Sequence, residues 1–310
     1  MAILFSSKTD DPEPWRAALA AHFEDLDFRV WPDDGGDPAD VEFALVWAQK
    51  EGALKHYPNL RAIFSLGAGV EHILRDSDLP AGVPIVRLVD AQLTRDMTEY
   101  VLAWVLYYHR DHHRYRAQQA ARQWRALPPV VAADRQVGIL GLGELGRASA
   151  SALAGLGFRV RGWSRTAKEI EGVACFDGAG GLGEFLDGVE ILVCLLPLTP
   201  ETRGIVDGAL LAALPAGACF INAARGGHMV AADLVAALAS GHIAGATLDV
   251  FEPEPLPAAD PLWSHPGVNV TPHVASITYH KTAAAEIVED IRRIRDGGRA
   301  RHVVDPAKGY

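Results

Sequence analysis

The chain has little positive charge. Its 29 lysines and arginines are outnumbered by 39 acidic residues, which gives a net charge of -10, and the basic residues are scattered rather than gathered in a stripe. Such a surface does not match a phosphate backbone, so binding to nucleic acid is not expected. The 310 residues, 49% of them hydrophobic, suffice for about two domains with buried cores.

Long hydrophobic runs are also missing. The longest nearly apolar run, residues 208–221, is interrupted by Pro215 and Gly217 and is too short to span a bilayer. The start, MAILFSSKTDDPEPW, has neither the basic region nor the apolar core of a secretory signal. We therefore expect no membrane span and a cytoplasmic location.

Cysteine is scarce. Cys175, Cys194 and Cys219 are odd in number, and each lies in or beside an apolar, strand-like stretch. This placement predicts buried, reduced thiols rather than a disulfide framework. No metal-ligand spacing occurs, so no metal is expected.

Two alternations of apolar runs and helical patterns make up the chain. The first hundred residues contain AILFSS, FRVWP, FALVWA, LRAIFSL and VPIVRL, with helical patterns from Trp15 to Phe23 and from Gln49 to Tyr57. The second alternation starts at Gln136 and contains QVGIL, FRVRGW, EILVCLL, ACFINAA, GATLDV and VNVTP. This rhythm predicts an α/β fold with two doubly wound parallel sheets.

Helical segments from about Thr94 to Ala120 and from about Ile277 to Arg295 lie where the alternations meet or end. Because the second segment follows the last strand, we expect the chain to return to its first domain. We predict a discontinuous substrate-binding domain of residues 1–101 and 276–310, a dinucleotide-binding domain of residues 102–275, and a hinged cleft between them.

A glycine-rich loop follows the strand QVGIL and opens a helical pattern. In Gly141-Leu-Gly-Glu-Leu-Gly146, the first glycine would form the tight turn, Gly143 would let the backbone approach a pyrophosphate, and Gly146 would allow close helix packing. At the helix N-terminus, the free backbone N–H groups around Glu144 and Leu145 would bind the phosphates. The strand before and the helix after make this motif far more specific than the glycines alone.

The end of the next strand lacks the acid that binds the ribose 2'-hydroxyl of NAD. FRVRGWSRT ends instead in Ser164 and Arg165, with Lys168 close by. These residues suit a 2'-phosphate and therefore NADP, with NAD less favoured. A solvated basic turn is the alternative interpretation.

Three chemically useful side chains follow three later strands. Arg225 comes after CFINAA, Glu254 after TLDVFEP and His273 after NVTP, with spacings of 29 and 19 residues. Because the carboxyl ends of parallel strands face one crevice, these groups should converge. A carboxylate that holds an imidazole favours its protonated form as a general acid, and an arginine can bind a substrate carboxylate. With a hydride carrier, this set suits the reduction of a 2-keto acid.

Six stretches carry a family likeness: LGAGVEHIL (66–74), GILGLGELG (138–146), LLPLTPETRGIV (195–206), INAARGG (221–227), LDVFEPEPLP (248–257) and TPHVAS (271–276). Together they span most of the chain and follow one family's order. With these stretches the sequence resembles the D-isomer-specific 2-hydroxyacid dehydrogenase family.

The resemblance implies a Rossmann nucleotide domain, a flavodoxin-like substrate domain and specific roles for individual residues. Arg225, Glu254 and His273 would be catalytic, and Arg225 would also bind substrate. The backbone of Leu66, Gly67, Ala68 and Gly69 would receive the substrate carboxylate. Residues that would line the cofactor are Leu196, Pro197, Ala223, Ala224 and Asp249.

Within the family, the chain most resembles bacterial NADPH-dependent glyoxylate/hydroxypyruvate reductases, through LVWAQ with Trp47, SLGAGVEHIL, GWSR and the ending DPAKGY. Their substrates are small, so Trp47 would wall the pocket; a core tryptophan is the alternative. Trp124 lies in a stretch that contacts the partner subunit in related dimers, which implies a homodimer. A simple surface tryptophan is equally compatible.

Other functions remain open at this level. The same fold also occurs in NAD(P)-sensing binding proteins without dehydrogenase turnover, although this chain has no long disordered extension. A thioether-cleaving hydrolase with tightly bound NAD would need additional lysine and histidine segments. The fold alone does not name the keto acid, because family members act on several substrates.

Overall fold

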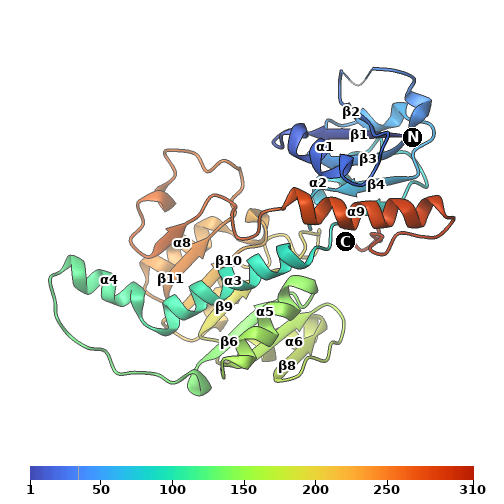
Figure 1. The fold of residues 1–310 in the computed structure, drawn as a ribbon. Helices are drawn as coiled ribbons and strands as arrows, with labels where there is room; N and C mark the ends of the chain where they lie inside the picture. The colour runs from blue at the N-terminus through green and yellow to red at the C-terminus, as the bar shows by residue number, and fades with distance from the viewer. Residues whose placement is uncertain (34) are drawn as a thin grey trace. The chain divides into compact units, whose positions relative to one another are not determined.

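The computed structural model of the protein describes residues 1–33 and 35–310. The chain divides into two compact units, one of Met1–Leu93 with Thr278–Tyr310 and one of Thr94–Ile277 (Figure 1). The chain thus returns to its first unit at its end. Among the described residues, no helix has the length and apolar character that a membrane crossing requires.

The first unit contains a five-stranded sheet. Its strands are β1 (Ala2–Ser7), β2 (Asp27–Val30), β3 (Val41–Trp47), β4 (Ala62–Ser65) and β5 (Ile85–Val86), paired in parallel in the order β2-β1-β3-β4-β5. This is the flavodoxin-like strand order that the resemblance implied. The inner strands β1, β3 and β4 are buried over most of their length, as expected for a parallel sheet covered on both faces.

Helices α1 (Pro12–Ala20) and α9 (His280–Arg295) pack together in this unit. The buried indole of Trp15 meets the ring of His280 edge-on at 5.0 Å between centroids. Helix α1 begins earlier than its apolar pattern indicated, because the Asp11 side chain accepts the Glu13 backbone N–H and caps the N-terminus. The remaining elements are α2 (Glu71–Leu74), η1 (Pro38–Asp40) and η2 (Ala53–His56).

The predicted helix from Gln49 to Tyr57 is wrong. Only the 3-10 turn η2 forms there, because Gly52 adopts a left-handed conformation with φ of 71°. The Gly52 N–H donates to both carboxylate oxygens of buried Asp76, each at 3.0 Å. A backbone amide bound in this way cannot enter a helical ladder.

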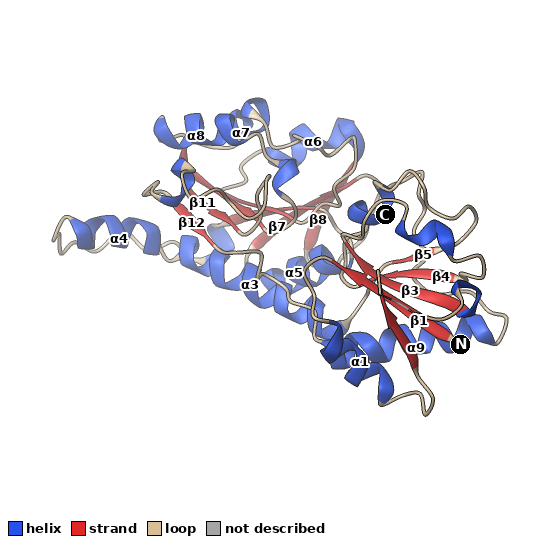
Figure 2. Cartoon of the chain, turned by 90° about the horizontal axis from the view of Figure 1, so that it is seen from above, coloured by secondary structure: helices blue, strands red, loops and turns tan. Residues whose placement is uncertain are grey.

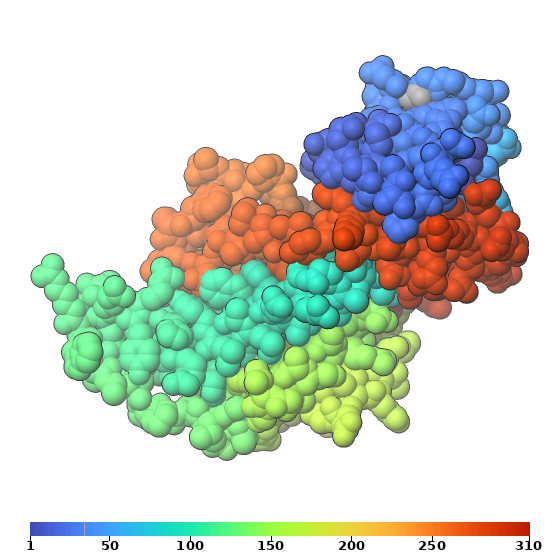
Figure 3. Space-filling view, viewed as in Figure 1, coloured from blue at the N-terminus to red at the C-terminus, as the bar shows by residue number. Residues whose placement is uncertain are grey.

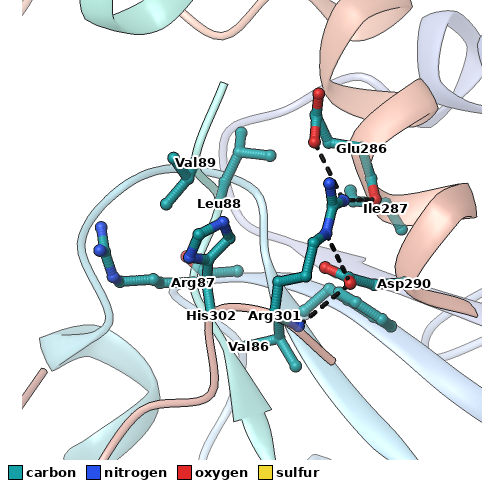
Figure 4. A pocket seen from close by; sticks show the side chains of 11 residues that line it. Val86, Arg87, Leu88, Val89, Glu286, Ile287, Asp290, Arg301 and His302 are labelled. Carbon is teal, nitrogen blue, oxygen red and sulfur yellow. Dashed lines mark hydrogen bonds and ion pairs between the residues drawn. The ribbon is translucent and has the colours of Figure 1, made fainter. Parts of the chain in front are cut away.

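The C-terminal tail is bound to α9 by an arginine. Figure 4 shows the Arg301 guanidinium directed at acidic residues of that helix. It forms ion pairs with Glu286 at 3.0 Å, Glu289 at 2.9 Å and Asp290 at 2.9 Å. Asp290 is 3% exposed, and a buried carboxylate of this kind requires a partner such as Arg301.

Beyond Arg301, the tail joins the edge of the first sheet. The Val304 N–H donates to the Ile85 carbonyl at 2.8 Å, and the Arg87 N–H donates to the His302 carbonyl at 3.1 Å. An antiparallel bridge between Val86 and Val303 lies between these bonds. The tail therefore satisfies the backbone of the short edge strand β5.

The second unit contains a seven-stranded parallel sheet. Its strands are β6 (Gln136–Leu140), β7 (Arg159–Ser164), β8 (Val173–Asp177), β9 (Ile191–Cys194), β10 (Ala218–Asn222), β11 (Ile243–Leu248) and β12 (Val268–Val270). Their order, β12-β11-β10-β9-β6-β7-β8, is the Rossmann arrangement with one added strand. The sequence analysis did not include β8, a five-residue edge strand whose residues are half-buried or exposed.

Helices cover both faces of this sheet (Figure 2). One face is covered by α6 (Gly178–Leu186), α7 (Gly208–Ala213) and α8 (Ala231–Ala239), and the other by α3 (Ala91–His109) and α5 (Glu144–Gly155). Two hydrophobic clusters result, one on each face. Short 3-10 turns are η3 (Ala132–Asp134), η4 (Gly226–His228) and η5 (Pro261–Trp263).

The helical segments at the junctions differ from their predicted extents. The stretch from Thr94 to Ala120 forms two helices, α3 and α4 (His112–Ala120), because Asp111 is left-handed with φ of 56°. Helix α9 begins at His280 rather than Ile277. The residues around α4, green in Figure 3, form an arm that stands out from the rest of the second unit.

All three cysteines are free thiols, but their burial differs. Cys194 and Cys219 are buried in the second sheet, and burial raises the pKa of each to about 12. Cys175 is only half-buried because it lies on the edge strand β8. The expectation of a buried thiol is therefore wrong at that position.

Candidate active site

The three predicted catalytic side chains follow three adjacent strands of the second unit. Arg225 follows β10, Glu254 follows β11 and His273 follows β12, and these strands pair in parallel in that order. Their carboxyl ends therefore lie along one edge of the sheet. The sequence topology alone predicted this placement.

His273 and Glu254 form a hydrogen-bonded pair. The imidazole Nδ1 lies 2.8 Å from Oε2 of Glu254, and the two side chains are 37% and 35% exposed. The other oxygen, Oε1, accepts the Phe251 backbone N–H at 2.8 Å. Because the carboxylate holds Nδ1, the Nε2 side of the ring is left for a reacting group.

The environment of Glu254 favours its ionised form. Burial raises the pKa of this carboxyl group, but the hydrogen bonds from His273 and the Phe251 amide, together with the positive charges of His273 and Arg225, outweigh burial. The net result is a lowered pKa. A carboxylate in this state can orient and stabilise an imidazolium.

The backbone around Arg225 is tightly held. The Arg225 N–H donates to Nδ1 of buried His228 at 3.2 Å, and the Asn222 side-chain amide donates to the Arg225 carbonyl at 3.1 Å. At Gly226, a Cβ atom would lie 2.0 Å from the backbone of Phe251. The loop of Arg225 is thus pressed against the chain segment that leads to Glu254.

The guanidinium of Arg225 donates to the Ala224 carbonyl at 2.7 Å through Nη1. Sequence reasoning did not single out Asn222 or His228 as supports for this residue. The only sequence signal noted for them is position, because each is a polar residue three positions from Arg225.

The carboxylate of Asp249 orders the loop that carries His273. It accepts hydrogen bonds from the Thr271 hydroxyl at 2.6 Å and from the N–H groups of Val274 and Ala275 at 2.9 Å each. The Asp249 carbonyl accepts the His273 N–H at 2.8 Å. Asp249 is 1% exposed, so these bonds form without competition from water.

His273 itself has a left-handed backbone with φ of 55°. This conformation is uncommon for a residue with a side chain and persists only where the surroundings enforce it. The bonds to Asp249 supply that enforcement. The family resemblance placed Asp249 beside the cofactor, and the sequence did not indicate that this acid holds the histidine loop.

The glycine loop has the geometry of a dinucleotide turn. Gly141 has φ of 102°, and a Cβ there would lie 2.7 Å from the carbonyl oxygen of Leu195, at the end of β9. A Cβ at Gly146 would lie 1.7 Å from the Gly141 carbonyl oxygen, so α5 packs closely on the turn. Gly143 is exposed, and no atom lies within 4 Å of its Cβ position.

This loop lies at the point where the strand order reverses, between β6 and β9. Open α/β sheets bind ligands at such a point. Exposed Glu144 and half-buried Leu145 form the first turn of α5. The other predicted cofactor contacts follow β9 and β10: Leu196, Pro197, Ala223 and Ala224.

At the end of β7, the predicted phosphate-binding residues differ in burial. The Ser164 side chain is buried, and its hydroxyl donates to the Thr166 carbonyl at 2.8 Å. Arg165 and Lys168 are exposed. The serine proton is already donated to Thr166, whereas a guanidinium carries five N–H donors, so the arginine is the better candidate for contact with an added phosphate.

The residues predicted to bind substrate in the first unit adjoin one another. Gly67 follows β4, and a Cβ there would lie 2.7 Å from the ring of Trp47, at the end of β3. The Leu66 N–H donates to the Val46 carbonyl at 3.1 Å. Leu66 and Gly67 are buried, whereas Ala68, Gly69 and Trp47 are half-buried.

The family model for the D-isomer specific 2-hydroxyacid dehydrogenase NAD binding domain matches residues 102–275. Over 315 aligned residues, the chain is 44% identical to glyoxylate/hydroxypyruvate reductase A of Photorhabdus laumondii, with 100% of each chain covered. The chain belongs to this dehydrogenase family. The reductase A of Serratia proteamaculans is 43% identical, again with complete coverage.

Solved structures of the dehydrogenase family share this fold. A D-isomer specific 2-hydroxyacid dehydrogenase from Xanthobacter autotrophicus, in complex with NADPH and MES, aligns with a TM-score of 0.96 and 49% identity, covering 100% of this chain and 99% of that one. An NADPH-dependent glyoxylate/hydroxypyruvate reductase from Sinorhizobium meliloti, with NADP and sulfate, aligns with a TM-score of 0.93 and 41% identity, with the same coverage.

The lowered pKa of Glu254 leads to a pH-dependent contribution to stability. Relative to Glu254→Gln, the native chain should gain stability above the ordinary pKa of 4.5, and this gain should be lost as pH falls through the lowered pKa of the folded state. Urea unfolding of both proteins from about pH 6 to about pH 3 measures the difference. In a His273→Ala background the pH-dependent difference should shrink. A difference that is constant with pH would contradict the assigned environment.

Proposed function

We propose that this dehydrogenase uses NADPH to reduce a small 2-keto acid of the glyoxylate or hydroxypyruvate type to a D-2-hydroxy acid. The observation that carries the proposal is the His273–Glu254 pair at the carboxyl edge of a sheet whose first strand ends in a dinucleotide loop. The relatives named as reductases and the related NADPH and NADP complexes support it.

The chemistry assigns one role to each catalytic side chain. When bound, the cofactor would supply a hydride to the carbonyl carbon of the substrate. His273 would donate a proton from Nε2 to the carbonyl oxygen, because Glu254 holds Nδ1. Glu254 would stabilise the imidazolium before transfer, and Arg225 would bind the substrate carboxylate and polarise the ketone.

The cofactor would be held mainly by backbone and by Arg165. Gly141 and Gly146 support this proposal because no side chain fits at either position. The amide groups at the start of α5 would face the pyrophosphate, and Arg165 with Lys168 would favour a 2'-phosphate. Other proposed contacts are Gly143, Glu144, Leu145, Ser164, Leu196, Pro197, Ala223, Ala224 and Asp249.

In the first unit, we propose that the backbone of residues 66–69 receives the substrate carboxylate and that Trp47 limits the length of the substrate. The close approach of Gly67 to the Trp47 ring supports a joint role. We propose that residues 1–101 with 276–310 form the substrate-binding domain and that residues 102–275 form the dinucleotide-binding domain. We also propose a cytoplasmic location, which suits three free thiols.

Replacement of the proton donor tests the reaction. His273→Asn should lower kcat for glyoxylate by about 100- to 10,000-fold and leave the Kd for NADPH nearly unchanged, because a general acid acts in the transition state. Stopped-flow NADPH absorbance and calorimetric NADPH titration measure the two quantities. His56→Asn, at an exposed histidine, is the matched control. If the native chain binds NADPH but oxidises none with glyoxylate, hydroxypyruvate or pyruvate, a sensing protein is the better description.

Cofactor choice tests Arg165. The native chain should favour NADPH over NADH in kcat/KM by about 10- to 100-fold, since charged hydrogen bonds to a 2'-phosphate contribute about 1.5–3 kcal/mol. Arg165→Ala should remove most of this preference, and Ser164→Asp with Arg165→Ala should erase or reverse it. Arg159→Ala, at the other end of β7, should change nothing. Equal use of both cofactors by the native chain would mean that the basic turn only faces solvent.

We further propose that the arm formed by α4 and the segment after it, residues 112–131, is a homodimer interface. After α4 the chain exposes Trp124 fully and Val131 by more than half, a combination that is unusual for a solvent-facing segment. Sedimentation velocity should show a dimer that Trp124→Ser with Val131→Ser converts to a monomer. Leu156→Ser removes a comparably exposed apolar residue elsewhere and should leave the dimer intact. A native monomer at micromolar concentration would contradict the interface.

A further inference from the structure

His72 of α2 joins two segments of the first unit to which the proposed function gives a role. Its ring packs against Trp47, with 4.2 Å between ring centroids and an angle of 53° between the planes. Its Nδ1 accepts the backbone N–H of Ala48 at 3.1 Å. Its Nε2 lies 3.3 Å from the Ser65 hydroxyl oxygen. One side chain therefore contacts both the end of β3 and the end of β4.

The hydrogen bonds define the state of this histidine. A backbone N–H can only donate, so Nδ1 must be the acceptor and the proton must lie on Nε2. Nε2 then donates to the Ser65 oxygen, which also receives the Gly67 N–H at 3.4 Å. The Ser65 hydroxyl in turn donates to the Gly69 carbonyl at 2.7 Å. Every donor in this chain of bonds has an acceptor, and the bonds end within residues 66–69.

The backbone next to Trp47 requires such a support. Ala48 has φ of 48°, a left-handed conformation that residues with a side chain seldom adopt. Its N–H is held by His72. On the other side, the Trp47 ring lies so close to Gly67 that a Cβ there would be 2.7 Å from it. Trp47 is thus fixed between His72 and Gly67.

We propose that His72 is a positioning residue for substrate selectivity, which fixes Trp47 against the loop of residues 66–69. This inference rests on the proposed function, in which Trp47 limits substrate length and the loop receives the carboxylate. With the wall held in place, short 2-keto acids fit and longer ones are excluded. Release of Ala48 from His72 would let the indole move and would admit a longer side chain.

Substitutions that separate the two ring nitrogens test the role. His72→Phe keeps a ring against Trp47 but removes both bonds. It should raise KM for glyoxylate and raise the ratio of kcat/KM for 2-oxobutyrate over glyoxylate, each by about two- to tenfold, with little change in kcat. His72→Asn places an acceptor near the position of Nδ1 and should restore most of the native ratio. His72→Gln, which reaches toward Ser65 instead, should not, and it serves as the second variant if the phenylalanine chain does not fold.

A measurement without turnover accompanies the kinetics. Amide hydrogen exchange of a peptide covering residues 45–49 should be faster in His72→Phe and near native in His72→Asn, because the Ala48 N–H loses and regains its acceptor. If exchange is equal in all variants, the hydrogen bond from Ala48 to His72 is not what positions Trp47.

The Trp47→Ala background distinguishes this inference from the proposed function. There, His72→Phe should leave the 2-oxobutyrate to glyoxylate ratio unchanged, because the wall that His72 positions is gone. An equal shift in both backgrounds would overturn the inference. Native selectivity in the Trp47→Ala variant would also overturn the inference. This holds even if the native chain reduces glyoxylate, as the proposed function requires. Loss of the reaction itself in the native chain would instead refute the proposed function.

Discussion

Parallel pairing of every strand is the constraint on which the candidate site depends. In the second unit all seven strands run in one direction, so the loops that follow them meet along a single edge. The glycine turn follows β6, and Arg225, Glu254 and His273 follow β10, β11 and β12. If one of these strands ran the other way, its functional residue would lie at the opposite edge. The parallel sheet alone therefore brings together side chains that lie far apart in the sequence.

Within this frame, the position of His273 is maintained against local backbone preference. A left-handed conformation costs about 1–2 kcal/mol for a residue with a Cβ. Hydrogen bonds to a charged group contribute about 1.5–3 kcal/mol each, and the Asp249 carboxylate accepts three of them from this loop. The stabilisation exceeds the strain, so the imidazole is held in place before any ligand binds. Preorganisation of this kind lowers the cost of reaching a reactive geometry.

Much of the fold and of the candidate site could be predicted from the sequence, because these features follow from period and spacing. Apolar runs of strand length predicted both sheets, and residues directly after such runs predicted the positions of Arg225, Glu254 and His273. The sequence analysis missed the edge strand β8, whose residues are only half-buried or exposed. The helix expected at Gln49–Tyr57 is replaced by a turn that buried Asp76 holds. The roles of Asp249 and His72 depend on bonds between segments far apart in the chain, which no local pattern contains.

The attachment of the C-terminal tail has a consequence for the order in which the protein matures on the ribosome. The edge strand β5 obtains its partner from residues 302–304, and α9 packs on α1 near the start of the chain. Residues 94–277 form their own compact unit and are synthesised before either of these. The middle of the chain can thus fold before α9 and the tail segment that pairs with β5 have been added to the first 93 residues. Until α9 and residues 302–304 have been synthesised, the N-terminal segment carries an open sheet edge and an uncovered apolar face.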